Sequence, residues 1–453
     1  MTKAPRASFE AGEIEQISST LSSANQAFMK HYPGESNRRQ AVHTVYGGAH
    51  LFKADSTEKL GAVALRSLNE YAPDAATLAR ILEMTGDEKI HAKVYERIVE
   101  KLKREPIEDF RLDFEDGYGN RPNAEEDGHA ASSAVEVARG LSGKTLPPFI
   151  GIRIKPMNED LRARSMRTLD IFVTTLVAET AGKLPENFVI TVPKVQLPEH
   201  VTAIVRLFEL LESKTGLPAG SLRVELMIET PQAIISAKGQ SGIGVLVDAA
   251  EGRCHSVHFG VYDYTAQCGI TAAYQTMRHP ACDFARQVML VSLAGTGVHL
   301  SDGATNILPV GPHRATEGKS LTPDQVRDNR EAVYKAWKLG FDDNMHSLRH
   351  GFYQGWDLHP AQLVTRYAAV YSFFLEGFEP GSSRLQAFVG KAALASLYGD
   401  VFDDAATGQG LLNFFLRGIA CGAISEADAT TTGLTIEELR SRSFLKILEA
   451  RRK

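Results

Sequence analysis

Short apolar runs alternate with helix-like patterns along most of this chain. The apolar runs end in glycine, proline or charged residues, as buried strands commonly do. Between them, apolar residues recur every three or four positions, which is typical of amphipathic helices. The predicted strands lie at 41–49, 109–119, 148–156, 188–196, 222–230, 254–264, 298–310 and 355–363.

Helical patterns separate these strands. Asp55, followed by Glu58, resembles a capping box at the start of the first helix, and a further helical pattern at 77–105 lengthens the first connection. Other helices are predicted at 163–181, 199–214, 282–294 and 322–338. Eight strand and helix units in series predict an α/β protein with a (β/α)8 TIM barrel, and a doubly wound open sheet is the competing arrangement.

The two ends of the chain differ from the middle. We predict an N-terminal helical leader at 1–40, packed on the outside, then the barrel at 41–365 and a C-terminal helical region at 366–453. No strands are expected in the last region. Its helical patterns lie at 365–376, 383–399 and 409–422, and Thr435 with Glu438 forms a second capping-box signature before the last helix.

Composition excludes several classes of function. The 453 residues are 43% hydrophobic and carry a net charge of -5, so no basic field attracts nucleic acid or anionic lipid. The first strand ends in YGGAHLF, which lacks the GxGxxG fingerprint of a dinucleotide fold. No apolar stretch reaches the length of a membrane span, and the N-terminus lacks the apolar core of a signal peptide. With four cysteines and no CxxC spacing, the sequence predicts a cytoplasmic protein with reduced thiols.

Two acids mark the ends of successive predicted strands. Glu229 ends the run LMIET and is followed at once by Pro231, which cannot donate a hydrogen bond to a neighbouring strand. Asp263 closes the run at 254–264. Because the chemistry of a parallel barrel lies at the carboxyl ends of its strands, and Mg²⁺ is usually held by one or two carboxylates, the pair predicts a metal site. The alternative is that both acids are helix caps or surface residues.

Other charged residues lie at similar positions. Asp113, Glu115 and Asp116 crowd the end of the second strand, which favours a cation or a shared proton nearby, although a plain acidic turn is the alternative. Arg153 and Lys155 are expected on one face of the third strand, where arginine can bind a carboxylate with both arms of its fork.

The sequence allows more than one role for Lys194 and predicts structural roles for three histidines. Lys194 could support the acidic cluster electrostatically, pair with Asp113, or act as a Schiff-base nucleophile, which a metal site would make redundant. His359 is expected to be structural. His43 and His258 lie in apolar strands and are expected to be interior histidines with satisfied hydrogen bonds.

The order of these motifs resembles the citrate lyase β-subunit-like and HpcH/HpaI aldolase superfamily. RLDFEDG resembles that family's DLEDG strand end, GIRIKP its arginine-bearing strand, VPKV its Pro-Lys strand and LMIETP its metal strand. HFGVYDYTAQCG is similar to a strand end of the form GxxD, and GWDLHPAQL to the terminal IHPxQ element. The resemblance covers roughly 41–365.

The resemblance implies a role for each matching residue. Glu229 and Asp263 would hold Mg²⁺, or Mn²⁺ as an alternative. Arg153 would bind the substrate carboxylate or the developing enolate, and Glu115 and Asp116 would lie beside the metal-bound waters. The resemblance further implies Lys194 as a catalytic residue, and Gly260, Thr230 and Pro231 as substrate-binding residues. Asp116, or a metal-bound water that it orients, is the candidate base, because a carboxylate crowded by Asp113 and Glu115 can have its pKa raised toward neutrality.

The resemblance also implies an activity. We expect a Mg²⁺-dependent carbon–carbon lyase or aldolase that acts on a 2-oxo or 3-hydroxy acid, with a coenzyme A thioester as one form of the substrate, and that assembles as a homo-oligomer. A malate synthase-like condensing enzyme is the nearest alternative. A barrel that has lost catalysis and serves as a binding scaffold is a different class of alternative, but it would lack a metal ligand, and none is missing here.

Overall fold

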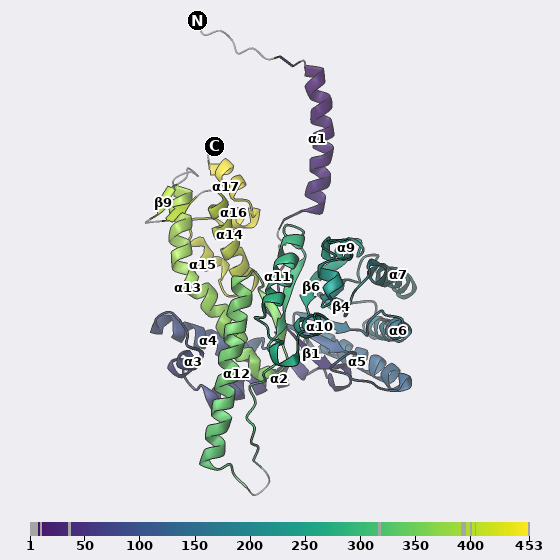
Figure 1. Cartoon of the computed structure of the whole chain (residues 1–453), viewed down its shortest axis with the longest axis vertical. Coiled ribbons are helices and arrows are strands. Elements are labelled where there is room, and N and C mark those ends of the chain that lie inside the picture. Colours follow the sequence, from purple (N-terminus) through teal and green to yellow (C-terminus); the bar gives the residue numbers. More distant parts are fainter. Residues whose placement is uncertain are drawn as a thin grey trace.

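Eight parallel strands form a closed barrel in the computed structural model, which describes residues 8–9, 11–34, 38–315, 319–390, 396–398, 401–403 and 405–451. Each strand pairs with the next along the chain, and β1 closes the ring by pairing with β8. Figure 1 shows the barrel strands surrounded by helices. The predicted TIM barrel is therefore confirmed. The strands are β1 (His43–Gly48), β2 (Asp109–Asp113), β3 (Phe149–Arg153), β4 (Phe188–Val192), β5 (Val224–Ile228), β6 (Cys254–Phe259), β7 (His299–Ala304) and β8 (Gln354–Asp357).

Helices surround this barrel and cover the outward side chains of the strands. Every residue of β2, β3, β4 and β5 is buried, because one face of each strand fills the barrel and the other packs under helices. The long helices are α2 (Ser56–Tyr71), α4 (Glu88–Arg104), α5 (Asn123–Gly143), α6 (Arg162–Glu179), α7 (Pro198–Thr215), α11 (Pro280–Leu293), α12 (Pro323–Arg349) and α13 (Leu363–Gly390). Shorter ones are α3 (Ala75–Leu82), α8 (Pro231–Ile234), α9 (Ile243–Asp248) and α10 (Val261–Gln267), with 3-10 turns η1 (Ala49–Leu51), η2 (Ala272–Tyr274) and η3 (Pro360–Gln362).

One of the two predicted capping boxes forms. Thr435 accepts a hydrogen bond from the backbone N–H of Glu438, whose side chain returns to the backbone of Thr435. The box predicted at Asp55 is wrong. Asp55 stands at the N-cap of α2 without a capping hydrogen bond, because its carboxylate lies 2.9 Å from the Lys59 ammonium instead.

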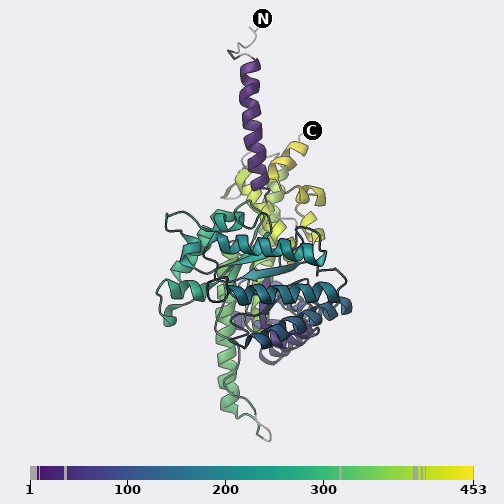
Figure 2. The ribbon, with the colours of Figure 1, turned by 90° about the vertical axis from the view of Figure 1, so that its right-hand side faces the viewer.

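The N-terminal helix α1 (Ala11–His31) projects away from the barrel (Figures 1 and 2). Residues 12–31 are exposed, including the apolar side chains of Ile14, Ile17 and Leu21. The expectation that this leader packs on the outside of the barrel is wrong. A helical sequence pattern predicts an apolar stripe on the helix, but it does not predict which surface, if any, packs against that stripe.

The C-terminal region departs from the prediction in two ways. Helix α13 continues through Pro380, where a break was expected, and the proposed boundary at 365/366 falls inside it. The flanking Gly377 leaves room for the ring of Phe414 on α14, so tertiary packing holds the helix at the proline. Strands β9 (Ser396–Tyr398) and β10 (Val401–Asp403) form an antiparallel pair where none was predicted. The remaining helices are α14 (Ala405–Ala420), α15 (Glu426–Thr430), α16 (Ile436–Ser441) and α17 (Phe444–Arg451).

Among the described residues, none of the helices combines the length and the apolar character that a membrane crossing requires.

Gly151 fixes how closely β3 and β4 approach each other. A Cβ atom at this position would lie 1.9 Å from the backbone oxygen of Val189 on β4. We therefore expect Gly151→Ala to lower the free energy of unfolding by at least about 1–3 kcal/mol, as overpacking does. The matched control is Gly128→Ala in α5, where an added Cβ meets nothing within 4 Å and should stabilise the helix by about 0.5–1 kcal/mol. Urea denaturation measures both, and equal stability of the two variants would contradict the close packing of these strands.

Candidate active site at the barrel mouth

The predicted acids and bases meet at the carboxyl ends of neighbouring strands. Glu229 directly follows β5, Lys194 lies two residues after β4, and Arg153 is the last residue of β3. Glu115 lies two residues after β2. Asp263 differs from the prediction, because β6 ends at Phe259 and Asp263 lies in the first turn of α10. That helix starts at the same rim, so Asp263 still reaches the group.

Glu229 is the buried centre of this group, with 1% of its surface exposed. One of its carboxylate oxygens accepts a hydrogen bond from the backbone N–H of Lys194 at 2.6 Å. The other lies against Gly260, where a Cβ atom would come within 2.3 Å of it. Burial, and then the nearby negative charge of Asp263, raises the pKa of Glu229 to about 8. Gly260 therefore makes room for a carboxylate that is held close to a second one.

Lys194 places a cation among the acids. Its ammonium pairs with Glu115 and lies 3.4 Å from Asp263 and 3.6 Å from Asp116. Its backbone has a φ of 52°, the left-handed conformation that non-glycine residues rarely adopt and that is often found at functional sites. In this conformation Lys194 donates its backbone N–H to Glu229 while its ammonium pairs with the other acids.

The contacts of Lys194 distinguish between its three predicted roles. Burial alone would lower the pKa of the Lys194 ammonium, but the charges of Glu115 and Glu229 outweigh burial and raise it. Lys194 is then protonated at neutral pH, which disfavours a Schiff-base nucleophile. Pairing with Asp113 is wrong, because Asp113 is bound by Arg153. Electrostatic support of the acidic cluster is the reading that these contacts favour.

Arg153 is buried and bound by other residues of the chain. Its Nε and Nη2 donate to the two carboxylate oxygens of Asp113 at 2.7 and 2.5 Å, so the fork is occupied by the protein. Its Nη1 lies 2.8 Å from Glu115 and 3.8 Å from Asp116. Binding of a substrate carboxylate by Arg153 stays a prediction, and the Nη1 edge is the part of the guanidinium directed at the acidic cluster.

The second-strand acids play different parts. Asp113 accepts hydrogen bonds from the backbone N–H groups of Glu115 and Gly117 and so shapes the turn. Glu115 is buried, and burial raises its pKa even though Arg153 and Lys194 oppose the rise. Asp116 has 61% of its side chain exposed. The segment is a turn, as the alternative reading held, but Glu115 points into the site and is not a solvated turn residue.

Other predicted residues have local structural roles. Thr230 caps α8, accepting from the N–H of Ala233 and donating to the carbonyl of Val195, and Pro231 is the first residue of that helix. His359 caps η3, so its structural role is confirmed. Lys155 lies beyond the end of β3 and pairs with Glu126 of α5, so strand alternation does not bring it to the partners of Arg153.

An aromatic wall beside Arg153 was not predicted. The guanidinium carbon lies 4.7 Å from the ring centre of Tyr46 and 5.4 Å from that of Trp356. The ring of His258 lies 5.8 and 5.7 Å from the same two rings. Within the described part of the chain, the Tyr46 hydroxyl, the Trp356 indole nitrogen and both ring nitrogens of His258 are buried without a hydrogen-bond partner.

These contacts separate the two strand histidines. The expectation of satisfied hydrogen bonds is wrong for His258, because neither of its ring nitrogens has a hydrogen-bond partner among the described residues. His43 accepts a hydrogen bond from the backbone N–H of Glu108 through Nε2, but its buried Nδ1 has no partner there, so the expectation holds for one of its two nitrogens. No signal within a single strand could have distinguished them.

The donor set fits a hard divalent cation. Glu229 and Asp263 offer carboxylate oxygens, the ligands that Mg²⁺ prefers. The pKa of Glu229 is raised partly because the negative charge of Asp263 is close, and a cation between the two would relieve that repulsion. Lys194 contacts both acids, through its backbone N–H at Glu229 and through its ammonium, which lies 3.4 Å from Asp263.

Comparison with protein-family models identifies the family of this chain. A family model described as "Domain of unknown function (DUF6986)" matches residues 21–447. The chain belongs to this family. A search of curated proteins found no match.

Solved structures resemble this DUF6986 member at low identity. A citrate lyase from Burkholderia xenovorans LB400 is 18% identical, with a TM-score of 0.52 over 77% of this chain and 94% of that chain. A malate synthase from Haloferax volcanii in a magnesium and glyoxylate complex is 15% identical, with a TM-score of 0.45 over 91% and 97%. The protein CitE from Mycobacterium tuberculosis in complex with magnesium, acetoacetate and coenzyme A is 13% identical, with a TM-score of 0.45 over 85% and 100%. The first likeness supports the barrel fold and nothing finer.

The raised pKa of Glu229 makes the stability of this DUF6986 protein depend on pH. A carboxyl group whose pKa rises on folding stabilises the protein fully below its ordinary pKa of 4.5, and this contribution is lost as pH rises through about 8. With a chelator present, the melting temperatures of the wild type and of Glu229→Gln are compared at pH 5.5 and at pH 8.5. We expect the decrease over this pH range to be several degrees larger for the wild type than for Glu229→Gln. Exposed Glu199, replaced by Gln, is the control and should follow the wild type. Parallel curves for all three proteins would mean that Glu229 ionises normally.

Proposed function

We propose that this protein is a metal-dependent carbon–carbon lyase or aldolase. It would cleave or form a bond next to the carbonyl group of a 2-oxo or 3-hydroxy acid, with a coenzyme A thioester as one form of the substrate. The observation that supports this proposal most strongly is that Lys194 contacts both acids at the carboxyl rim of the barrel, Glu229 through its backbone N–H and Asp263 through its ammonium. In TIM barrels this rim is where catalysis takes place.

Glu229 and Asp263 are the residues that would hold Mg²⁺ or Mn²⁺. When bound, the ion would supply a Lewis acid that stabilises negative charge developing on the substrate's carbonyl oxygen. Glu229 is positioned for this by the backbone N–H of Lys194, and Asp263 by the first turn of α10. The Glu229 carboxylate is thus held by a backbone donor, whereas the Asp263 carboxylate faces the Lys194 ammonium.

Charged residues of the chain complete the proposed site. The protonated Lys194 and the Nη1 edge of Arg153 keep positive charge beside the acids, which favours an anionic substrate. Asp116 is the proposed base, because its carboxylate is exposed to solvent and lies 3.6 Å from the Lys194 ammonium. Tyr46 and Trp356 would line the wall against which the substrate lies, and each presents a polar group that no described residue hydrogen-bonds.

Proton exchange tests this proposal without knowledge of the full substrate. An enzyme that stabilises charge on a carbonyl oxygen also speeds the exchange of protons on the neighbouring carbon with solvent. We expect the methyl protons of pyruvate, the C3 methylene protons of 2-oxobutyrate or the acetyl methyl protons of acetyl-CoA to exchange in deuterated water containing Mg²⁺, as followed by NMR. Exchange with acetyl-CoA alone would assign the thioester form.

Glu229→Gln is the decisive variant in this assay, and Glu199→Gln is its matched control. Because the first removes a ligand of the charge-stabilising ion, we expect exchange to slow by about 10²–10³-fold or more, and chelator should do the same to the wild type. The control should exchange at the wild-type rate. Exchange no faster than in protein-free buffer with all three compounds would overturn the proposed function.

A further inference from the structure

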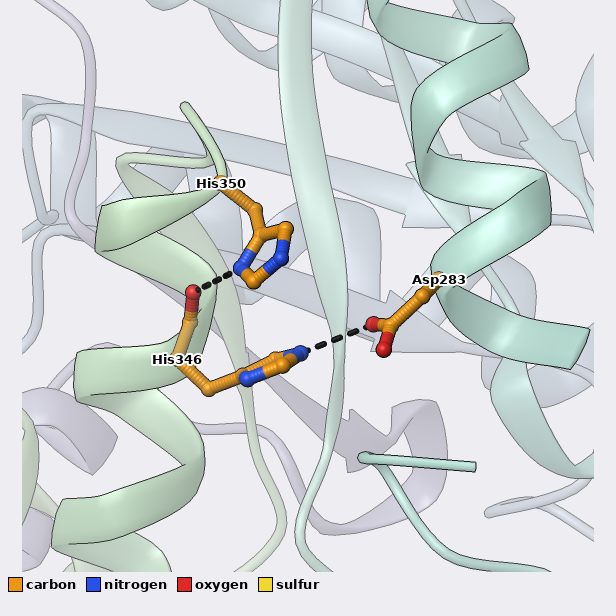
Figure 3. A group of neighbouring side chains, drawn as sticks. All are labelled: Asp283, His346 and His350. Carbon is orange, nitrogen blue, oxygen red and sulfur yellow. Dashed lines mark hydrogen bonds and ion pairs between the residues drawn. The ribbon is translucent and has the colours of Figure 1, made fainter. Parts of the chain in front are cut away.

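Two helices outside the barrel mouth bring an aspartate and two histidines together. His346 lies near the end of α12 and His350 is its C-cap residue, so the two rings stand one helical turn apart on the same side. Asp283 comes from the first turn of α11. Each residue is half-buried, and one ligand atom from each lies within 4.8 Å of the others (Figure 3). In the described part of the chain, no other group of three His, Cys, Asp or Glu residues meets this condition.

The histidine rings are oriented by hydrogen bonds. Nδ1 of His350 lies 2.8 Å from the backbone carbonyl oxygen of His346 and donates to it, which leaves the lone pair on Nε2. Figure 3 shows this second nitrogen facing the gap between His346 and Asp283. Nε2 of His346 lies 2.8 Å from a carboxylate oxygen of Asp283. Metal-binding histidines are commonly oriented as His350 is, by a hydrogen bond from the nitrogen that does not bind the ion. The hydrogen bond of His346 instead runs to Asp283, another member of the group, and shows that these two side chains already meet.

The aspartate is fixed as well. Arg286 donates to Asp283 at 2.9 Å, and Arg286 is itself fully buried and held by Asp302 of β7. Burial would raise the pKa of Asp283, but the hydrogen bond and charge of His346, with help from Arg286, lower it. The carboxylate is therefore ionised at neutral pH and anchored to the barrel through Arg286.

We propose that Asp283, His346 and His350 bind a transition-metal ion, with Zn²⁺ as the best match. Two imidazole nitrogens and one carboxylate oxygen are ligands that Zn²⁺ accepts, whereas Mg²⁺ prefers oxygen alone. Tetrahedral Zn²⁺ with bonds of about 2.0–2.1 Å needs ligand atoms about 3.3 Å apart, which small side-chain rotations would achieve here. Three protein ligands leave a fourth position for water or an external ligand. The ion would also join α11 to α12.

The chain contains a matched control for this proposal. His313 lies 3.1 Å from Asp328, so it makes the same kind of histidine–aspartate pair, but among the described residues no second histidine joins it. His313→Gln should therefore leave zinc binding unchanged. His350→Gln removes one ligand at the end of α12 while leaving the pair of His346 and Asp283 intact.

Calorimetric titration of the chelator-treated full chain with Zn²⁺, in excess Mg²⁺, tests the site. We expect one zinc equivalent in the wild type and in His313→Gln, and an affinity at least ~100-fold weaker in His350→Gln. Co²⁺ provides a second measurement, because tetrahedral coordination with nitrogen ligands gives strong visible absorption. That absorption should be lost in His350→Gln and in Asp283→Asn but kept in His313→Gln.

The result is independent of the proposed function, because zinc binding here should persist in Glu229→Gln. Unchanged zinc affinity in His350→Gln, or no zinc equivalent in the wild type, would overturn the site and leave only a structural histidine–aspartate pair. Circular dichroism of each variant identifies any that fails to fold. If His350→Gln is one of these, His346→Gln replaces it in both measurements, with the same expected loss.

Discussion

A carboxylate buried without a nearby positive charge is costly, and the mouth of this barrel buries two, Glu229 and Glu115. The chain meets this cost with Lys194 and Arg153, and the rest of the rim follows from that need. Lys194 adopts a strained backbone conformation that lets its N–H reach Glu229 while its ammonium reaches the other acids. Gly260 has no side chain because Glu229 occupies that space. The positive charges that the rim supplies to its acids thus come from Lys194 and Arg153.

The same constraint acts deeper in the barrel. Arg111 pairs with Asp109, donates to Thr191 and lies 3.5 Å from Glu225, all inside the ring of strands. Thr191 and Ser256 also donate to Glu225, so this buried carboxylate has partners from three other strands. Because removing one member of a buried pair leaves an uncompensated charge, these contacts tie the strands in one register. The rim acids are thereby placed on a rigid base.

The sequence predicted the barrel and the acids of its mouth for a simple physical reason. Strand ends are marked locally, by proline and by charged residues after apolar runs, as at Glu229 and Pro231. Parallel strands then bring those ends to one rim whatever their separation along the chain. The left-handed backbone of Lys194 could not be predicted, because it depends on where Glu229 lies after folding.

Features that depend on distant partners were missed. The aromatic wall needs Tyr46 and Trp356, which lie at opposite ends of the barrel sequence and meet only because β1 and β8 close the ring. The histidine–aspartate group joins Asp283 to residues more than sixty positions away. Asp263 was placed in a strand because the apolar pattern of β6 continues into the first turn of α10. A local sequence pattern shows neither which distant residues will meet nor whether an apolar run continues as strand or as helix.

The central claim is that Glu229 and Asp263 share one divalent ion at the barrel mouth. Anomalous diffraction from crystals soaked with Mn²⁺ tests it most directly, because manganese can be located by its own scattering. The account predicts an anomalous peak bonded to both carboxylates, with the Lys194 ammonium displaced from its place among the acids. A fully soaked crystal with no peak between Glu229 and Asp263, or with manganese only at other positions, would contradict it.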